Sequence, residues 1–221
     1  MIITIEGNIG SGKSTLLKAL KSRYENNPNV IFLKEPVEQW ETITDVNGLT
    51  MLEKFYKDKE KYSFPFQMMA YISRLALFKD AYKNNPNAVF ITERSLQTDK
   101  HVFAQMLYDD ELIEEVEMQI YLKWFEHFAE DYLLTKVIYV DAEPIKCMKR
   151  IAIRNRPGEN QIQHEYINNC DIYHKKMLEN FSNDQILHID GNIDVDDEGI
   201  IMNSWLDKID PIISSLLNII N

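Results

Sequence analysis

Residues 7–15 read Gly-Asn-Ile-Gly-Ser-Gly-Lys-Ser-Thr and match the pattern G-x-x-x-x-G-K-[ST]. An apolar run at 1–5 precedes this stretch, and leucines at helical spacing follow it. A strand, a glycine loop and a helix in this order form the phosphate-binding P-loop, whose backbone N–H groups and helix N-terminus face phosphate oxygens. We therefore expect a nucleotide here, with its terminal phosphates near Lys13 and Mg²⁺ on the Ser14 hydroxyl.

The rest of the chain alternates between short apolar runs and longer helical patterns. Further strands are predicted at 30–33, 88–92, 136–140 and 185–189. Helices are predicted at 49–61, 63–83, 96–108, 112–132, 143–153, 162–181 and 200–219. In the second of these, Ser63 is expected as the N-cap and Pro65 in the first turn.

Strands separated by helices form parallel βαβ units with helices on both faces. The pattern therefore predicts an α/β protein with a P-loop kinase fold, in which helices flank a five-stranded parallel sheet. We see no linker or repeat, and expect one domain over residues 1–221.

Composition and charge exclude several classes of protein. The 221 residues include 24 basic and 35 acidic ones, for a formal net charge of −11. Such a surface repels phosphate backbones, so we expect no nucleic-acid partner. No apolar run approaches the roughly 20 residues that cross a bilayer, and no leader pattern is present, so we expect no membrane partner and a cytoplasmic location. Cys147 and Cys170 are interpreted as reduced thiols.

Acidic residues follow three of the predicted strands, at Glu35, Glu93 and Asp141. The carboxyl ends of parallel strands meet at one edge of the sheet, so these side chains are expected beside the P-loop. Glu35 is a candidate general base for phosphoryl transfer, and Glu93 with Arg94 is a candidate for metal and phosphate contacts. A solvated turn acid and a local ion pair are the structural alternatives.

A basic cluster follows the fourth predicted strand. Arg150 and Arg154 are four residues apart and share a helix face, and Arg156 precedes Pro157-Gly158. In an acidic chain this cluster indicates an Arg-rich lid over about 150–161 whose guanidinium groups contact nucleotide phosphates. The alternative is a solvated basic face.

An aromatic and polar cluster comprises Trp40, Tyr56, Phe66, Gln67, Tyr71 and Arg74. Gln67 carries a donor and an acceptor, which suits pairing with the edge of a planar base. The alternative for the aromatic residues is ordinary core packing.

Six segments together resemble the deoxynucleoside kinase family, in particular its branch of deoxycytidine, deoxyguanosine and deoxyadenosine kinases. They are IEGNIGSGKST at 5–15, EPVEQW at 35–40, Tyr56, SFPFQMMAYISR at 63–74, TERSLQTD at 92–99 and RIAIRNRPGE at 150–159. The resemblance spans nearly the whole chain and is weakest after Asp190. It implies an enzyme of nucleotide salvage that transfers the ATP γ-phosphate to the 5′-hydroxyl of a deoxynucleoside with Mg²⁺.

The resemblance also implies residue roles. Glu35, which accepts the hydroxyl proton, is expected to be catalytic with Arg94 and Lys13, and Ser14 and Glu93 are expected to hold the metal. The expected ATP-binding residues are Asn8, Ile9, Gly10, Ser11, Gly12, Lys13, Ser14, Thr15, Arg150, Arg154 and Arg156, with residues 191–195 near the adenine. The expected nucleoside-binding residues are Glu35, Trp40, Tyr56, Phe66, Gln67, Arg74, Arg94, Asp99, Phe103 and Glu159.

Substrate preference is expected to depend on Ala70, Arg74 and Asp99. A charged pair beside the base disfavours the thymine methyl group, so we expect deoxycytidine or purine deoxynucleosides over thymidine. The resemblance further implies a homodimer. Two alternatives are a nucleoside-monophosphate kinase of the thymidylate type, which needs extra cations for an acceptor phosphate, and a P-loop switch without metabolic turnover.

Overall fold

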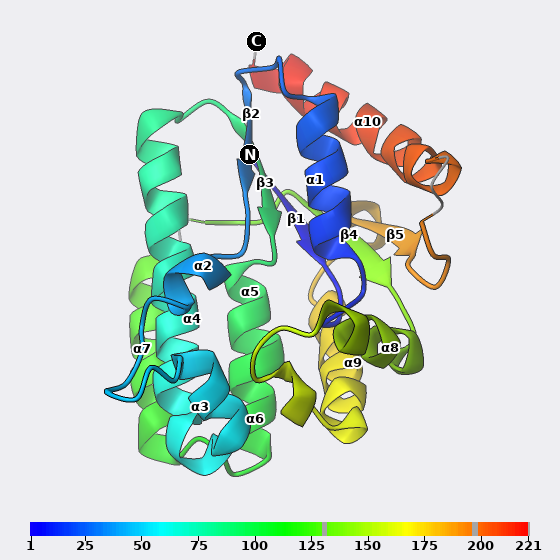
Figure 1. Cartoon of the computed structure of the whole chain (residues 1–221). Helices are drawn as coiled ribbons and strands as arrows, with labels where there is room; N and C mark the ends of the chain where they lie inside the picture. Colours follow the sequence, from blue (N-terminus) through cyan, green and yellow to red (C-terminus); the bar gives the residue numbers. More distant parts are fainter. Residues whose placement is uncertain (130–131, 196–198, 221) are drawn as a thin grey trace.

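Five strands form one parallel sheet in the order β2-β3-β1-β4-β5 (Figure 1). The computed structural model describes residues 1–129, 132–195 and 199–220. The strands are β1 (Ile2–Glu6), β2 (Val30–Leu33), β3 (Val89–Glu93), β4 (Lys136–Asp141) and β5 (Ile186–Asp190). β1 lies in the centre and pairs in parallel with β3 and β4. The predicted α/β fold with a five-stranded parallel sheet is confirmed.

Helices cover both faces of the sheet and surround its carboxyl edge (Figure 1). The α-helices are α1 (Lys13–Arg23), α2 (Val37–Trp40), α3 (Met51–Lys57), α4 (Lys59–Asn84), α5 (Leu96–Thr98), α6 (Gln105–Asp109), α7 (Glu115–Ala129), α8 (Pro144–Arg154), α9 (His164–Leu178) and α10 (Ile200–Ile220). A π-helical segment, η1 (Asp99–Ala104), joins α5 to α6. The short 3₁₀ turns are η2 (Glu159–Gln161) and η3 (Asn183–Gln185).

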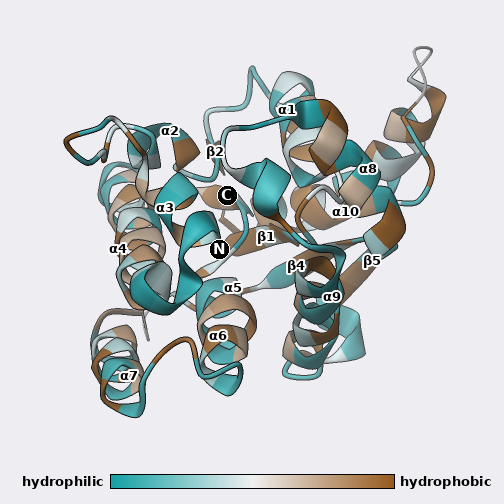
Figure 2. Ribbon diagram, turned by 60° about the horizontal axis from the view of Figure 1, so that its bottom comes forward, coloured by the Kyte–Doolittle hydropathy of each residue, from teal (hydrophilic) through white to brown (hydrophobic). Residues whose placement is uncertain are grey.

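Each face of the sheet contributes to a different part of the core, because successive strand side chains point to opposite faces. Ile3 and Ile5 of β1 belong to the core cluster that includes α1 and α10. Ile2 instead clusters with Phe78 of α4, and Tyr139 of β4 clusters with residues of η1 and α9. The brown colour of β1 in Figure 2 marks this buried, hydrophobic strand. This packing buries both faces of the sheet, so the carboxyl edge of the sheet is the part that a binding site can occupy.

The expected start of the long helix is wrong. α4 begins at Lys59, and the side chain of Asp58 caps it by accepting a hydrogen bond from the Lys61 N–H (3.2 Å). Asp58 also ends α3, because its φ of −147° and ψ of 83° are not helical. Ser63 is therefore a buried residue within the helix, and Pro65 lies inside it rather than in its first turn.

The helix predicted at 112–132, the two cysteines and the absence of a membrane span can also be compared with the structure. The predicted helix at 112–132 begins at Glu115, and its residues 130 and 131 lie outside the described residues. Cys147 and Cys170 are free, buried thiols on α8 and α9, as expected. Among the described residues, no helix has the length and apolar character needed to span a membrane. The cytoplasmic location stays a prediction.

Candidate active site

The glycine loop brings the start of α1 to the carboxyl end of β1. Gly12 has a φ of 109°, in the left-handed region that favours glycine, and a Cβ there would meet no atom within 4 Å. A Cβ at Gly10 would lie 2.7 Å from the carbonyl oxygen of Cys147, so the loop packs closely against α8. No side chain of the described residues caps α1, which leaves its first N–H groups for an anion.

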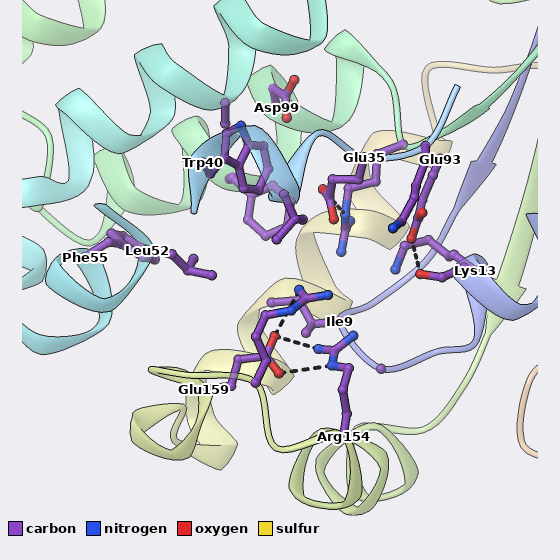
Figure 3. A pocket seen from close by; sticks show the side chains of 18 of the residues that line it. Ile9, Lys13, Glu35, Trp40, Leu52, Phe55, Glu93, Asp99, Arg154 and Glu159 are labelled. Atoms are coloured by element: carbon purple, nitrogen blue, oxygen red, sulfur yellow. Dashed lines mark hydrogen bonds and ion pairs between the residues drawn. The ribbon is translucent and has the colours of Figure 1, made fainter. Parts of the chain in front are cut away.

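A cavity of about 480 Å³ opens beside this loop (Figure 3). Every residue expected above to be catalytic or to bind the metal, ATP or the nucleoside lines it, except Asn8 and Ser11. The sequence candidates Asp141 and Tyr71 do not line it. The Asn8 side chain instead supports the loop, because its Nδ2 donates to the Ile167 carbonyl (2.9 Å) and its Oδ1 accepts from the Ile9 N–H (2.8 Å). The fold therefore brings together segments from most of the chain.

Glu35 lies among three cations in this cavity. Its Oε1 is 3.0 Å from Nη2 of Arg74 and 3.3 Å from Nε of Arg94. Burial alone would raise the pKa of Glu35, but the charges of Arg94, Arg74 and Lys13 outweigh it and lower the pKa to about 2. The carboxylate is therefore ionised at neutral pH and able to accept a proton or a hydrogen bond.

Lys13 is the buried cation of the P-loop, and its Nζ donates to the Asn8 carbonyl (2.7 Å). Burial and the neighbouring Arg94 charge lower the pKa of Lys13 to about 7. A triphosphate beside Lys13 would favour the charged ammonium, because an opposite charge stabilises it.

Ser14 and Glu93 supply the oxygen atoms expected at a metal site. The Ser14 hydroxyl donates a short hydrogen bond to Oε1 of Glu93, and both residues line the cavity. Mg²⁺ is usually bound through one or two carboxylates together with substrate phosphates and water. The described residues contain no cluster of three metal-binding side chains, so this pair fits Mg²⁺ only together with a nucleotide.

Arg74 connects Asp99 to Glu35 within this cavity. Its Nε and Nη2 donate to the two carboxylate oxygens of Asp99 at 2.8 and 3.3 Å, and its Nη1 donates to the Glu93 carbonyl at 2.8 Å. Burial raises the pKa of Asp99, and the Arg74 guanidinium opposes this rise. The expected Arg74–Asp99 pair is thus present, and it also extends to Glu35, which the sequence did not indicate.

Aromatic rings form the other wall of the cavity (Figure 3). Phe55 and Phe66 are stacked with their centroids 4.6 Å apart, and Trp40 meets Phe66 edge-on at 5.7 Å. Gln67 is buried in the same region, and among the described residues its Oε1 has no hydrogen-bond partner. A buried amide oxygen without a partner is unfavourable, so this site suits a planar ligand with a hydrogen-bond donor on its edge.

The basic segment at 150–161 lines the cavity on the side of α8. Arg154 donates to both carboxylate oxygens of Glu159 (2.7 and 3.0 Å), and Arg156 lies 3.4 Å from the same carboxylate. Arg150 donates to the Ser11 and Gly191 carbonyls and pairs with Asp194. The loop at 191–195 is thereby held beside the P-loop.

Several lining residues were missed as site residues: Lys34, Val37, Leu52, Phe55 and Tyr166. Leu52 and Phe55 follow an ordinary helical apolar pattern, which does not distinguish a core residue from a pocket residue. Tyr166 lies on α9 and meets Tyr56 edge-on with centroids 6.4 Å apart. No local signal in the sequence places α9 opposite α3.

Comparison with known proteins agrees with this geometry. The family model for deoxynucleoside kinase matches residues 3–214. Human deoxycytidine kinase is 32% identical over 97% of this chain and 91% of its own length. A fowlpox virus protein named "Probable deoxycytidine kinase" is 35% identical over 97% of this chain and 88% of its own length. The mitochondrial deoxyguanosine kinase of Xenopus laevis is 28% identical over 80% and 72% of the two chains.

The family match covers the glycine loop, the segment at 150–161 and the cavity described above, and it favours the nucleoside-kinase interpretation over the monophosphate-kinase and switch alternatives. A P-loop, a buried carboxylate among cations and a group of aromatic rings lie together in one cavity. The chain belongs to the deoxynucleoside kinase family.

Proposed function

We propose that this enzyme transfers the γ-phosphate of ATP to the 5′-hydroxyl of a deoxynucleoside, as one domain over residues 1–221 with a lid at about 150–161. The observation that carries the proposal is the position of Glu35, which lies in one cavity with Lys13 and Arg94 and is ionised. Such a carboxylate suits a neutral hydroxyl acceptor, whereas it would repel the phosphate of a nucleoside monophosphate. The expected role is nucleotide salvage.

In the proposed mechanism, Glu35 accepts the proton of the 5′-hydroxyl as the hydroxyl oxygen bonds to the γ-phosphorus and the bond to ADP breaks. Lys13 and the N–H groups of the P-loop stabilise the charge on the transferred group, and Arg94 stabilises charge near the 5′-oxygen. Ser14 and Glu93 would hold Mg²⁺, which neutralises phosphate charge when bound. Arg150, Arg154 and Arg156 would orient the phosphates from the lid.

The nucleoside would lie between the catalytic cluster and the aromatic wall. Gln67 would pair with the base through its unpartnered Oε1 and its amide N–H groups. Trp40, Phe66 and Phe103 would pack around the base, while Tyr56 and Glu159 would hold the sugar 3′-hydroxyl.

We further propose a preference for deoxycytidine or purine deoxynucleosides over thymidine. The buried pair of Arg74 and Asp99 supports it, because the pair fills space beside Ala70 with charge that a methyl group would desolvate. The relatives named as deoxycytidine and deoxyguanosine kinases are consistent with this preference. In Arg74→Met/Asp99→Ala, kcat/KM for thymidine should rise; no rise would contradict the pocket assignment.

A homodimer is proposed through the outer face of α7. Val116, Ile120, Trp124 and Phe128 are each more than 40% exposed and follow one another every four residues, so they form one apolar stripe. Figure 2 shows α7 at the outside of the molecule with hydrophobic residues along it. A second copy of the chain would bury this stripe.

An acceptor panel tests the proposed function. The enzyme is incubated with ATP, Mg²⁺ and, separately, each of the four deoxynucleosides, their ribose counterparts and their monophosphates, and the phosphorylated product and ADP are measured. We expect ADP to form in proportion to a nucleoside 5′-monophosphate. Faster turnover with monophosphates would identify a monophosphate kinase, and ATP hydrolysis that no acceptor changes would indicate a switch.

A further inference from the structure

His174 of α9 is a buried titratable residue that the mechanism above does not use. It is 0% exposed, and its Nε2 lies 3.1 Å from Nη1 of Arg94. Its Nδ1 lies 2.6 Å from the carbonyl oxygen of Cys170, one turn earlier in the same helix. The imidazole therefore connects α9 to the arginine that follows β3.

The partners of the ring determine which nitrogen carries the proton. A guanidinium group has only donors, so Nε2 must accept from Arg94 through its lone pair. A carbonyl oxygen has only acceptor capacity, so Nδ1 must carry the proton and donate it to Cys170. Burial and the Arg94 charge lower the pKa of His174 well below its usual value, which keeps the ring neutral and Nε2 available as an acceptor.

The surroundings of the imidazole leave it little freedom to move. Phe103 meets the His174 ring edge-on with centroids 6.1 Å apart, and Tyr139 of β4 lies 6.4 Å away on the same measure. The ring of Phe103 also faces the Arg94 guanidinium at 4.8 Å. His174 and Phe103 therefore hold the same guanidinium group by a hydrogen bond and by a cation–π contact.

The contacts of Arg94 are divided among its nitrogens. Nη1 donates to the Gly7 carbonyl (3.2 Å) and to His174, whereas Nε faces Glu35. Among the described residues, Nη2 makes no hydrogen bond. Two acceptors on the protein side thus fix one end of the guanidinium group and leave Nη2 as the donor for a ligand. The backbone at Arg94 adds to this constraint, with φ at 63° in the left-handed region.

We propose that His174 is a positioning residue, which holds Arg94 so that its remaining donor meets the reacting phosphate beside Glu35. This inference rests on the proposed function, because it assigns a role to the arginine that the proposed mechanism uses. Small errors in the position of a catalytic group reduce the rate strongly, so the loss of this acceptor is expected in kcat more than in substrate binding.

Two amide substitutions distinguish the roles of the two ring nitrogens of His174. In His174→Gln, the amide lies near the position of Nε2 and its oxygen can accept from Arg94. In His174→Asn, the shorter amide lies near the position of Nδ1 and can reach only the Cys170 side. We expect His174→Asn to reduce kcat about tenfold or more while KM for the deoxynucleoside changes less than about twofold, and His174→Gln to recover most of kcat. Both variants remove the same ring, so their thermal midpoints provide the matched control for stability.

Equal kcat in the two variants, after correction for the folded fraction, would overturn the proposal. A second measurement applies even when His174→Asn does not fold: ¹⁵N NMR of the wild-type protein at neutral pH should find Nδ1 protonated and Nε2 unprotonated. The opposite tautomer, or a charged ring, would also overturn it. Failure of the proposed function would give a different result: the wild-type enzyme would phosphorylate no nucleoside, although NMR would still find Nδ1 protonated and Nε2 unprotonated.

Discussion

Arg74→Met tests whether the buried Asp99 carboxylate is stabilised in the folded protein by the charge of Arg74. Arg74 is the only group among the described residues that hydrogen-bonds the Asp99 carboxylate, and the Asp99 side chain is 2% exposed. Removing the guanidinium leaves a buried carboxylate without its hydrogen-bonded counter-charge, while the charge of Arg94 still acts to lower its pKa. Such a change typically costs about 3–5 kcal/mol, whereas replacing both partners by apolar residues is often close to neutral.

The cost should depend on pH in a direction that follows from the charge. Burial raises the pKa of Asp99 and the Arg74 guanidinium opposes this rise, so the pKa of Asp99 should rise further in Arg74→Met. A folded-state pKa above the unfolded value gives stability that is complete below the unfolded pKa and is lost as the pH rises through the folded pKa. The loss is at most about 1.4 kcal/mol per pH unit, which sets an upper bound of about 3 kcal/mol between pH 5 and pH 7.

The double variant Arg74→Met/Asp99→Ala is the matched reference, because it also lacks Arg74 but contains no carboxylate at position 99 that could be left unpaired. Urea denaturation of both variants at about pH 5 and about pH 7 gives the difference in their free energies of unfolding. We expect this difference to shift by up to about 3 kcal/mol in favour of the double variant at the higher pH. A shift of less than about 0.5 kcal/mol would refute the reasoning, because Asp99 would then not be an unpaired buried charge.

Three further outcomes are expected. Glu35→Gln should retain deoxynucleoside binding by calorimetry but lose about 10²-fold or more in kcat, and near-normal turnover would remove Glu35 from the role of base. Lys13→Met should abolish most turnover yet raise the thermal midpoint of the ligand-free protein at about pH 6. The reason is that the pKa of Lys13 is lowered to about 7 in the folded protein. Such a lysine destabilises the fold below that pH and no longer does so above its unfolded pKa of about 10.4. The stabilisation has an upper bound of about 5 kcal/mol, and a midpoint unchanged at about pH 6 would contradict the burial argument. Trp124→Glu should convert a dimer into a monomer in light scattering with kinase activity partly retained, and an unchanged mass would place the interface elsewhere.

The sequence predicted those parts of the structure that depend on local pattern. The alternation of apolar runs with helical patterns was sufficient for all five strands and their parallel arrangement, because each strand is short, buried and bounded by helices. The G-x-x-x-x-G-K-[ST] pattern located the P-loop, since its glycines have conformations and close contacts that few other residues tolerate.

The parts that were missed depend on contacts between distant segments. Asp58 ends one helix and starts the next, a double role that a single capping position in the sequence does not express. The extension of the Arg74–Asp99 pair to Glu35 requires α4 and β2 to lie side by side at a spacing that no local pattern encodes. Tyr166 and His174 lie on a helix with an ordinary apolar face, and only the packing of α9 brings them to the cavity and to Arg94.

The central place of β1 has a consequence for synthesis of the protein. Ile3 aligns with Ile91 on one side and with Lys136 on the other, so about 130 residues separate the strand from its later partner. At ribosomal speeds of about 5–20 residues per second, β4 is synthesised roughly 7–27 s after β1, and until then the β4 side of β1 has no strand partner. During that interval a nascent chain offers chaperones an unpaired hydrophobic strand edge, and slower translation lengthens its exposure.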